Sequence, residues 1–235
     1  MDATSLLRQK AASVQNFALF SGISPSDCAS IVSTAREKHF QRGETIFAEG
    51  DPVRLIWLLV AGCAKITQLG LNGNEVILRM NGSGEIVGAF GLCSQAKCEY
   101  CSAAQTTQPS TTLVWEAANF EAILRRFLVF HRNVSHALQE RLQELEQRFR
   151  EVSTEKVGSR VSSELIRLSK RLGRPIDGQR EVNLSRAELA QLTGTTLFTV
   201  SRLLCQWQSL GIVSARREVV RVRDVEALAE LSQRE

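Results

Sequence analysis

Three cysteines, Cys93, Cys98 and Cys101, lie within nine residues of one another, which is an unusual density outside disulfide-rich proteins. Thiolates at such spacing can bind an iron-sulfur cluster or zinc, and a close pair can form a redox-sensitive disulfide. Cys63 is the candidate fourth thiol. The segment predicts a thiolate-bound metal or cluster, with a thiol redox switch and unreactive cysteines as the alternatives.

The remaining cysteines and the histidines carry weaker signals. Cys28 and Cys205 fall on apolar helix faces and are expected in the core. The imidazoles, His39, His131 and His136, could serve as axial haem ligands, but no second feature points to haem. Surface or structural roles are the better expectation for them.

The strongest pattern runs from residue 184 to 204. Ser185 can cap a first helix, Gly194 can form a tight turn, and Val200 can anchor a second helix on the first. The spacings of four residues from Ala190 to Gly194 and six from Gly194 to Val200 are typical of a DNA-binding helix-turn-helix. A purely structural helical hairpin is the alternative.

A second helix starting near residue 196 would turn a small set of side chains towards the major groove. These are Thr196, Leu197, Phe198, Ser201 and Arg202. Arg202 can pair bidentately with guanine, and Phe198 can pack on a thymine methyl group. The alternative for Phe198 is a place in the protein core.

Residues 212–223 follow as an apolar segment, a basic turn and a second apolar segment. This pattern predicts a β-hairpin wing. Arg216 and Arg217 in its turn could reach DNA phosphates beside the groove.

Residues 43–115 have a different sequence pattern, in which short β-rich segments are separated by turn sequences. Gly50-Asp51-Pro52, Asn72-Gly73 and Asn81-Gly82 favour turns because Asn and Gly tolerate positive φ. The region predicts a small antiparallel barrel or sandwich. A capped helix is expected before it, starting at Ser24.

From about residue 119 the apolar residues recur with the period of a helix. Apolar residues there recur at spacings of 4, 3, 4 and 3, at Leu138, Leu142, Leu145, Phe149 and Val152. Polar residues flank them, which is typical of a helix that packs along a partner helix. Self-association is therefore expected, with packing on the chain's own barrel as the alternative.

The formal net charge of +4 is unevenly distributed. From Lys156 onwards 14 basic and 9 acidic residues leave +5, and the rest of the chain carries −1. A basic surface attracts polyanions such as nucleic acid. The longest apolar run, Leu55 to Ala61, is far too short to cross a bilayer, and no secretion signal is evident, so a cytoplasmic protein is expected.

Together, the β-rich region, the helix with the 4-3-4-3 spacing and the helix-turn-helix with its wing resemble the CRP/FNR family of bacterial transcription regulators. The local matches include residues 43–47, 84–88 and 199–204. The resemblance implies an α+β fold with an N-terminal β-roll or jelly-roll sensor domain, a long dimerisation helix and a C-terminal winged helix-turn-helix. The corresponding ranges are 1–130, 131–156 and 157–235.

The resemblance also implies a homodimer whose two recognition helices read a palindromic DNA site, under the control of a signal in the N-terminal domain. RNA polymerase would be a partner if the protein activates transcription. Arg202 matches the family's base-reading arginine, and Ser201 matches a serine of the FNR-like branch. Phe198 stands where better-known members carry a base-reading glutamate.

The match fails where cyclic-nucleotide-binding members hold their ligand. Ala89 stands at the position of their ribose-binding glutamate, and Cys101-Ser102 at that of their phosphate-binding Arg-Ser pair. Cyclic AMP is therefore not expected as the ligand, because its buried phosphate would lack a cation. Oxygen-sensing members keep their cluster cysteines near the N-terminus, whereas this chain has none before Cys28.

The sequence thus predicts a DNA-binding regulator controlled by a redox or gas signal at a cysteine-ligated site. The alternatives are a cyclic-nucleotide-like module that senses an organic molecule and a protein that binds DNA constitutively without a cofactor. No nucleophile elbow, phosphate loop or paired His and carboxylate motif indicates an enzyme.

Overall fold

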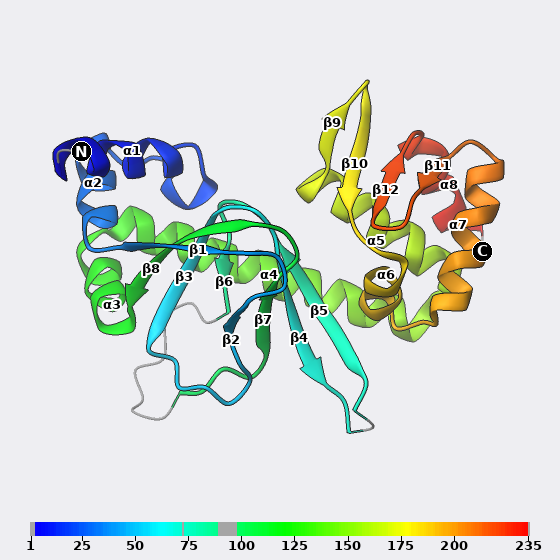
Figure 1. Ribbon diagram of the computed structural model, residues 1–235, viewed down its shortest axis with the longest axis horizontal. Helices are drawn as coiled ribbons and strands as arrows, with labels where there is room; N and C mark the ends of the chain where they lie inside the picture. The colour runs from blue at the N-terminus through cyan, green and yellow to red at the C-terminus, as the bar shows by residue number, and fades with distance from the viewer. Residues whose placement is uncertain (1–2, 72, 89–97, 235) are drawn as a thin grey trace. The chain divides into compact units, whose positions relative to one another are not determined.

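A computed structural model describes residues 3–71, 73–88 and 98–234 of the chain. The chain divides into two compact units, one made of residues 1–69 and 78–142 and the other of residues 70–77 and 143–235 (Figure 1). Ala89 and Cys93 lie outside the described residues. Within the described ranges, no helix is both long and apolar enough to span a membrane.

The first unit is built on two four-stranded sheets, ordered β1-β8-β3-β6 and β2-β7-β4-β5 (Figure 1). Their strands are β1 (Arg36–Phe40), β2 (Thr45–Phe47), β3 (Leu55–Ala61), β4 (Ala64–Leu69), β5 (Glu75–Asn81), β6 (Ile86–Val87), β7 (Ala103–Thr106) and β8 (Ser110–Glu116). The pairs β1–β8, β3–β8, β3–β6, β2–β7 and β4–β7 are antiparallel. The expected β-roll in an α+β fold is confirmed.

Strand β3 explains why its sequence is apolar without alternation. Successive side chains of a strand point to opposite faces. Ile56 and Leu58 join the core formed with the helices, whereas Trp57 and Leu59 join the core inside the roll. Both faces of β3 are therefore buried.

Helices complete the first unit. They are α1 (Ala3–Val14), the short 3-10 helix η1 (Ala18–Phe20), α2 (Pro25–Ser33), α3 (Ala117–Arg126) and the long α4 (Leu128–Thr154), which continues into the second unit. Ser24 caps α2 as predicted, because its Oγ accepts a hydrogen bond from the amide of Asp27 at 3.1 Å.

In its described residues, the second unit continues from α4 into four further helices and a four-stranded sheet ordered β11-β12-β10-β9. Its elements are α5 (Val157–Leu172), β9 (Arg174–Ile176), β10 (Gln179–Asn183), α6 (Arg186–Thr193), α7 (Leu197–Ser209), β11 (Val213–Ala215), β12 (Val219–Val222) and α8 (Val225–Arg234). The wing hairpin and the two helices before it lie where the sequence predicts them.

Helix α4 carries the predicted apolar stripe on an exposed face. The exposed fractions of its residues run from 38% for Leu138 to 75% for Phe149. Within the described part of the chain, none of the five side chains of this stripe is buried. A row of exposed apolar side chains at coiled-coil spacing is expected to pack against another helix.

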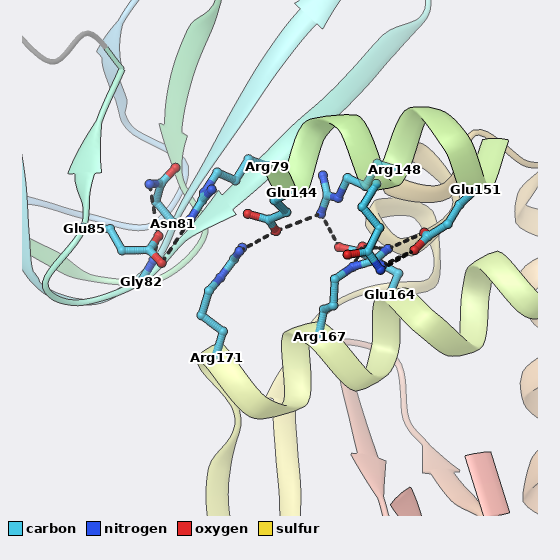
Figure 2. Close-up of polar contacts among 11 residues, drawn as sticks. Arg79, Asn81, Gly82, Glu85, Glu144, Arg148, Glu151, Glu164, Arg167 and Arg171 are labelled. Carbon is cyan, nitrogen blue, oxygen red and sulfur yellow. Dashed lines mark hydrogen bonds and ion pairs between the residues drawn. The ribbon is translucent and has the colours of Figure 1, made fainter. Parts of the chain in front are cut away.

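A different set of α4 side chains pairs with α5 through buried charges (Figure 2). Arg167 forms two hydrogen bonds with Glu151, at 2.6 and 2.8 Å, and two with Glu164, at 2.7 and 3.0 Å. Arg148 approaches the other oxygen of Glu164 at 2.5 Å. Arg171 donates to Glu144 at 2.6 Å. These six residues are called the α4–α5 ion network below.

The two central carboxylates of this network are almost completely buried. The exposed fraction is 1% for the Glu164 side chain and 4% for that of Glu151. Burial by itself would raise the pKa of Glu151, but the hydrogen bonds and charge of Arg167 outweigh it, so the pKa lies below its ordinary value. Burial lowers the pKa of Arg148, although Glu164 and Glu144 oppose the shift.

We predict that Arg167→Met destabilises the protein by about 3–5 kcal/mol, because it leaves two buried carboxylates without their main cation. Urea unfolding measures the change. Arg125→Met is the matched control, because Arg125 pairs with Glu121 on the surface and such pairs contribute about 0–1 kcal/mol. Equal losses in the two variants would contradict the role given to the network.

The α4–α5 ion network also makes the stability of the protein depend on pH. Because the folded pKa of Glu151 is lowered, its contribution to stability is fully present above the ordinary value of 4.5 and disappears as pH falls through the folded value. The stability difference between the wild type and Arg167→Met should therefore shrink below about pH 4.

Candidate nucleic-acid interface

Helices α6 and α7 form a helix-turn-helix with complete capping. The Ser185 Oγ accepts from the Glu188 amide at 3.1 Å, and the Glu188 carboxylate accepts from the Ser185 amide at 2.8 Å. Gly194 ends α6 with a φ of 60°, which is left-handed backbone that favours glycine. Thr196 then caps α7 by accepting from the Thr199 amide at 3.1 Å.

Helix α7 divides into a buried face and an exposed face. Val200, Leu203, Leu204 and Trp207 are buried and hold the helix on the unit. Phe198 is 78% exposed and Leu197 53% exposed, while Arg202 also lies on the surface. The alternative in which Phe198 packs in the protein core is therefore wrong.

Phe198 and Arg202 share one stripe of the helix because they are four residues apart. Of the predicted groove-facing residues, Thr196 and Leu197 are exposed beside this stripe and Ser201 is half-buried. The structure therefore places all five candidates at the exposed side of α7 or at its first turn. A large exposed aromatic ring next to an arginine suits contact with base edges in a groove.

The prediction that Cys205 lies in the core is wrong. It is exposed, not part of the core, because it lies three residues after Arg202 and seven after Phe198, on the same stripe. The spacing of Val200, Leu204 and Trp207 marks the opposite face as the buried one. Cys28 is buried as expected.

The wing lies beside this helix in the sequence and belongs to the same unit. β11 pairs antiparallel with β12, and the Arg216 amide closes the turn by donating to the Val219 carbonyl at 2.8 Å. Arg216 and Arg217 are both exposed. Arg221 instead pairs with Glu181 of β10 at 2.9 Å, so its charge serves the sheet.

Inside the β-roll, aromatic side chains fill the region next to Gly88. The rings of Phe47 and Tyr100 are stacked with centroids 3.7 Å apart. A Cβ added to Gly88 would lie only 2.4 Å from the Phe47 ring, so glycine is required there. The Tyr100 hydroxyl donates to the Leu55 carbonyl, and burial raises the pKa of this tyrosine to about 12.

The structure does not bring all the candidate metal-binding cysteines together. Cys63 precedes β4 and its carbonyl accepts from the Thr107 amide at 2.9 Å, whereas the Cys101 carbonyl accepts from Gln68 at the other end of β4. Five residues of extended strand span about 16 Å. Sulfurs that bind one zinc ion lie about 4 Å apart, so Cys63 cannot share a site with Cys101.

The other cysteines of this set leave the metal hypothesis untested. Cys98 is in a disulfide, so its sulfur is not a thiolate that could bind a metal. Cys101 is free and exposed. Cys93 lies outside the described residues. Among the described residues, no three His, Cys, Asp or Glu side chains form a metal site. For Cys93, Cys98 and Cys101 metal binding stays a prediction, and no step is derived through it.

A β-roll joined by a long helix to a winged helix-turn-helix defines the class of DNA-binding regulators with a sensor domain. Two family models match the chain accordingly. The cyclic nucleotide-binding domain matches residues 37–127, and the Crp-like helix-turn-helix domain matches residues 159–231.

Individual relatives agree with the family models. The chain is 27% identical to the cyclic AMP receptor protein of Thermus thermophilus over 91% of its own length and 96% of that protein. It is 25% identical to the global nitrogen regulator of Synechocystis, over 81% and 86% of the two chains. The solved structure of FixK2 from Bradyrhizobium japonicum has the same fold, with a TM-score of 0.73, 21% identity and coverage of 84% and 96%. The chain belongs to the CRP/FNR family and is a DNA-binding transcription regulator.

The two faces of α7 predict opposite responses to truncation. Phe198→Ala should change the free energy of unfolding by no more than about 0.5 kcal/mol, because its ring touches water in the free protein. Leu204→Ala should cost about 2–5 kcal/mol, because it leaves a cavity in the core. Urea unfolding of both variants, without DNA, checks this. A large loss for Phe198→Ala would place its ring in the core after all.

Proposed function

We propose that the protein acts as a homodimer that binds a palindromic DNA site through two copies of α7. The observation that carries the proposal is the exposed stripe with Phe198 and Arg202 on a helix whose other face is buried. Recognition helices of such dimers enter successive major grooves about 34 Å apart. The function consists of binding and involves no chemical step.

The exposed stripe on α4 supports the homodimer. Its five apolar residues repeat at 4-3-4-3 spacing, and a second copy of α4 would offer the same stripe in return. We therefore assign residues 131–156 to dimerisation, residues 1–130 to sensing and residues 157–235 to DNA binding. Packing two stripes together would remove apolar surface from water on both copies.

The N-terminal unit has the fold of a small-molecule sensor domain, but its ligand is proposed to differ from cyclic AMP. The Thermus thermophilus relative is named for cyclic AMP. In this chain Phe47 and Tyr100 fill the space beside Gly88, and Cys101-Ser102 supplies no cation for a phosphate. A buried phosphate without a cation is costly, which favours a different signal.

Leu145→Glu should convert the dimer to a monomer, because a buried pair of carboxylates would face each other across the two-fold axis. Light scattering should give half the mass, and specific DNA binding should weaken about 100-fold or more, as expected when both half-sites cannot be held together. Gln143→Glu, on the far face of the same helix, is the control and should leave both properties unchanged. A dimeric Leu145→Glu protein would show that another surface holds the dimer.

Arg202 and Arg216 should affect DNA binding in different ways. Arg202→Ala should lose about 1–3 kcal/mol of discrimination at one base pair of each half-site, because its guanidinium pairs with a guanine. Arg216→Ala should weaken binding to all sequences alike and lower the salt-dependence slope by about 1, because its partner is a phosphate. Binding to a set of single-base variants at several salt concentrations separates the two. A uniform loss in Arg202→Ala would refute its base-reading role.

A further inference from the structure

A cavity of about 530 Å³ opens in the first unit. Three segments form its walls: residues 16–21 around η1, residues 79–86 at the turn between β5 and β6, and residues 133–141 of α4. Its volume falls within the range of small-molecule sites in proteins. Gly88, beside which related sensor domains hold cyclic nucleotides, is not a lining residue, although Arg141 of the lining donates to the Gly88 carbonyl.

A buried polar atom in this wall lacks a partner. Asn81 is only 2% exposed, and its Nδ2 donates to the Glu85 carboxylate at 3.1 Å and to the Ile86 carbonyl at 3.2 Å (Figure 2). Both partners are acceptors, so the amide cannot be turned round. Its Oδ1 is left without a hydrogen bond among the described residues. A buried acceptor of this kind calls for a donor from a bound molecule or water.

The charges around the cavity are balanced. Arg79 and Arg141 contribute two positive charges, and Glu85 and Glu140 contribute two negative ones. Glu140 lies 3.6 Å from His136 at the rim, and Glu85 lies 3.3 Å from Arg79. Such a wall offers no net attraction to an anion or a cation. It suits a molecule that carries both charges at once.

One side of the cavity is apolar. The ring of Phe17 lies so close to Gly84 that a Cβ added there would be 3.0 Å from it. Leu19 and Ile86 extend this side. A ligand with a short apolar side chain would therefore find a matching surface next to the charged groups.

We propose that the cavity binds a zwitterionic small molecule of the free α-amino acid class. Its ammonium group faces Glu140, its carboxylate faces Arg141, and its side chain packs on Phe17. The assignment of this molecule as the regulatory signal rests on the proposed function, but its binding does not.

A molecule bound in the cavity would contact α4 directly. Ala137, Glu140 and Arg141 belong to that helix, and the Arg141 Nη1 also donates to the Gly88 carbonyl at 3.0 Å. The neighbouring residues Leu138 and Leu142 carry the exposed stripe. An occupied cavity therefore fixes the side of the helix adjacent to the surface on which dimerisation is proposed.

The test is ligand-observed NMR and calorimetry on the full chain, with each standard L-amino acid added separately. At least one should show saturable binding. Its N-acetyl derivative, which lacks the ammonium charge, and its amide derivative, which lacks the carboxylate, should each bind about tenfold or more weakly, because each lacks one of the two charges that face Glu140 and Arg141. Absence of saturable binding by every amino acid overturns the proposal.

Two variants assign the binding to this cavity. Ser83→Trp places a large ring at an exposed lining position and should abolish binding, whereas Ser33→Trp, exposed on α2 outside the cavity, should preserve it. Binding that survives Ser83→Trp contradicts the assignment. DNA binding is measured separately on the same samples, so a failure here leaves the proposed function standing.

Discussion

The buried carboxylates of Glu151 and Glu164 impose the constraint on which the DNA-binding unit depends. Arg148 and Arg167 hold them away from water with directed hydrogen bonds and opposite charge. Apolar contacts between α4 and α5 would allow the helices to slide, whereas these pairs fix one register. Because α5 contacts α6, α8 and the sheet, this register also sets the frame in which α7 is held.

Helix α7 shows how one short element can satisfy two demands. Its buried face must attach it firmly, which Val200, Leu204 and Trp207 do at helical spacing. Its exposed face must then leave side chains in water that a globular protein would normally bury. The exposure of the Phe198 ring to water is unfavourable in the free protein. Exposed aromatic groups of that size are typical of binding surfaces.

The sequence predicts those parts whose pattern follows from local rules. The caps at Ser24 and Ser185, the turn at Gly194 and the stripe on α4 all arise from short-range geometry, so residue types alone reveal them. Strand β1 was missed because four of its five residues are exposed, which leaves no apolar alternation to detect. Strand β7 contains no large apolar residue and β9 has only three residues, so their sequences do not mark them as strands.

Tertiary placement explains what the sequence could not show. Cys63 and Cys101 look like members of one set because they are both cysteines, but β4 separates their backbones by about 16 Å. The cavity beside Asn81 joins three segments that are distant in the chain, and no residue spacing signals it. Cys205 is different, since the helical period that buries Val200 and Trp207 already places it on the exposed face.

Helix α4 combines these functions through two parallel stripes. Leu138, Leu142, Leu145, Phe149 and Val152 form the exposed one. Each is preceded by a residue of the second stripe, whose members line the cavity or belong to the α4–α5 ion network: Ala137, Arg141, Glu144, Arg148 and Glu151. The same 4-3-4-3 spacing therefore serves both stripes, about 100° apart around the helix. Arg141 of the proposed ligand cavity is therefore the direct neighbour of Leu142 on the stripe proposed for dimerisation.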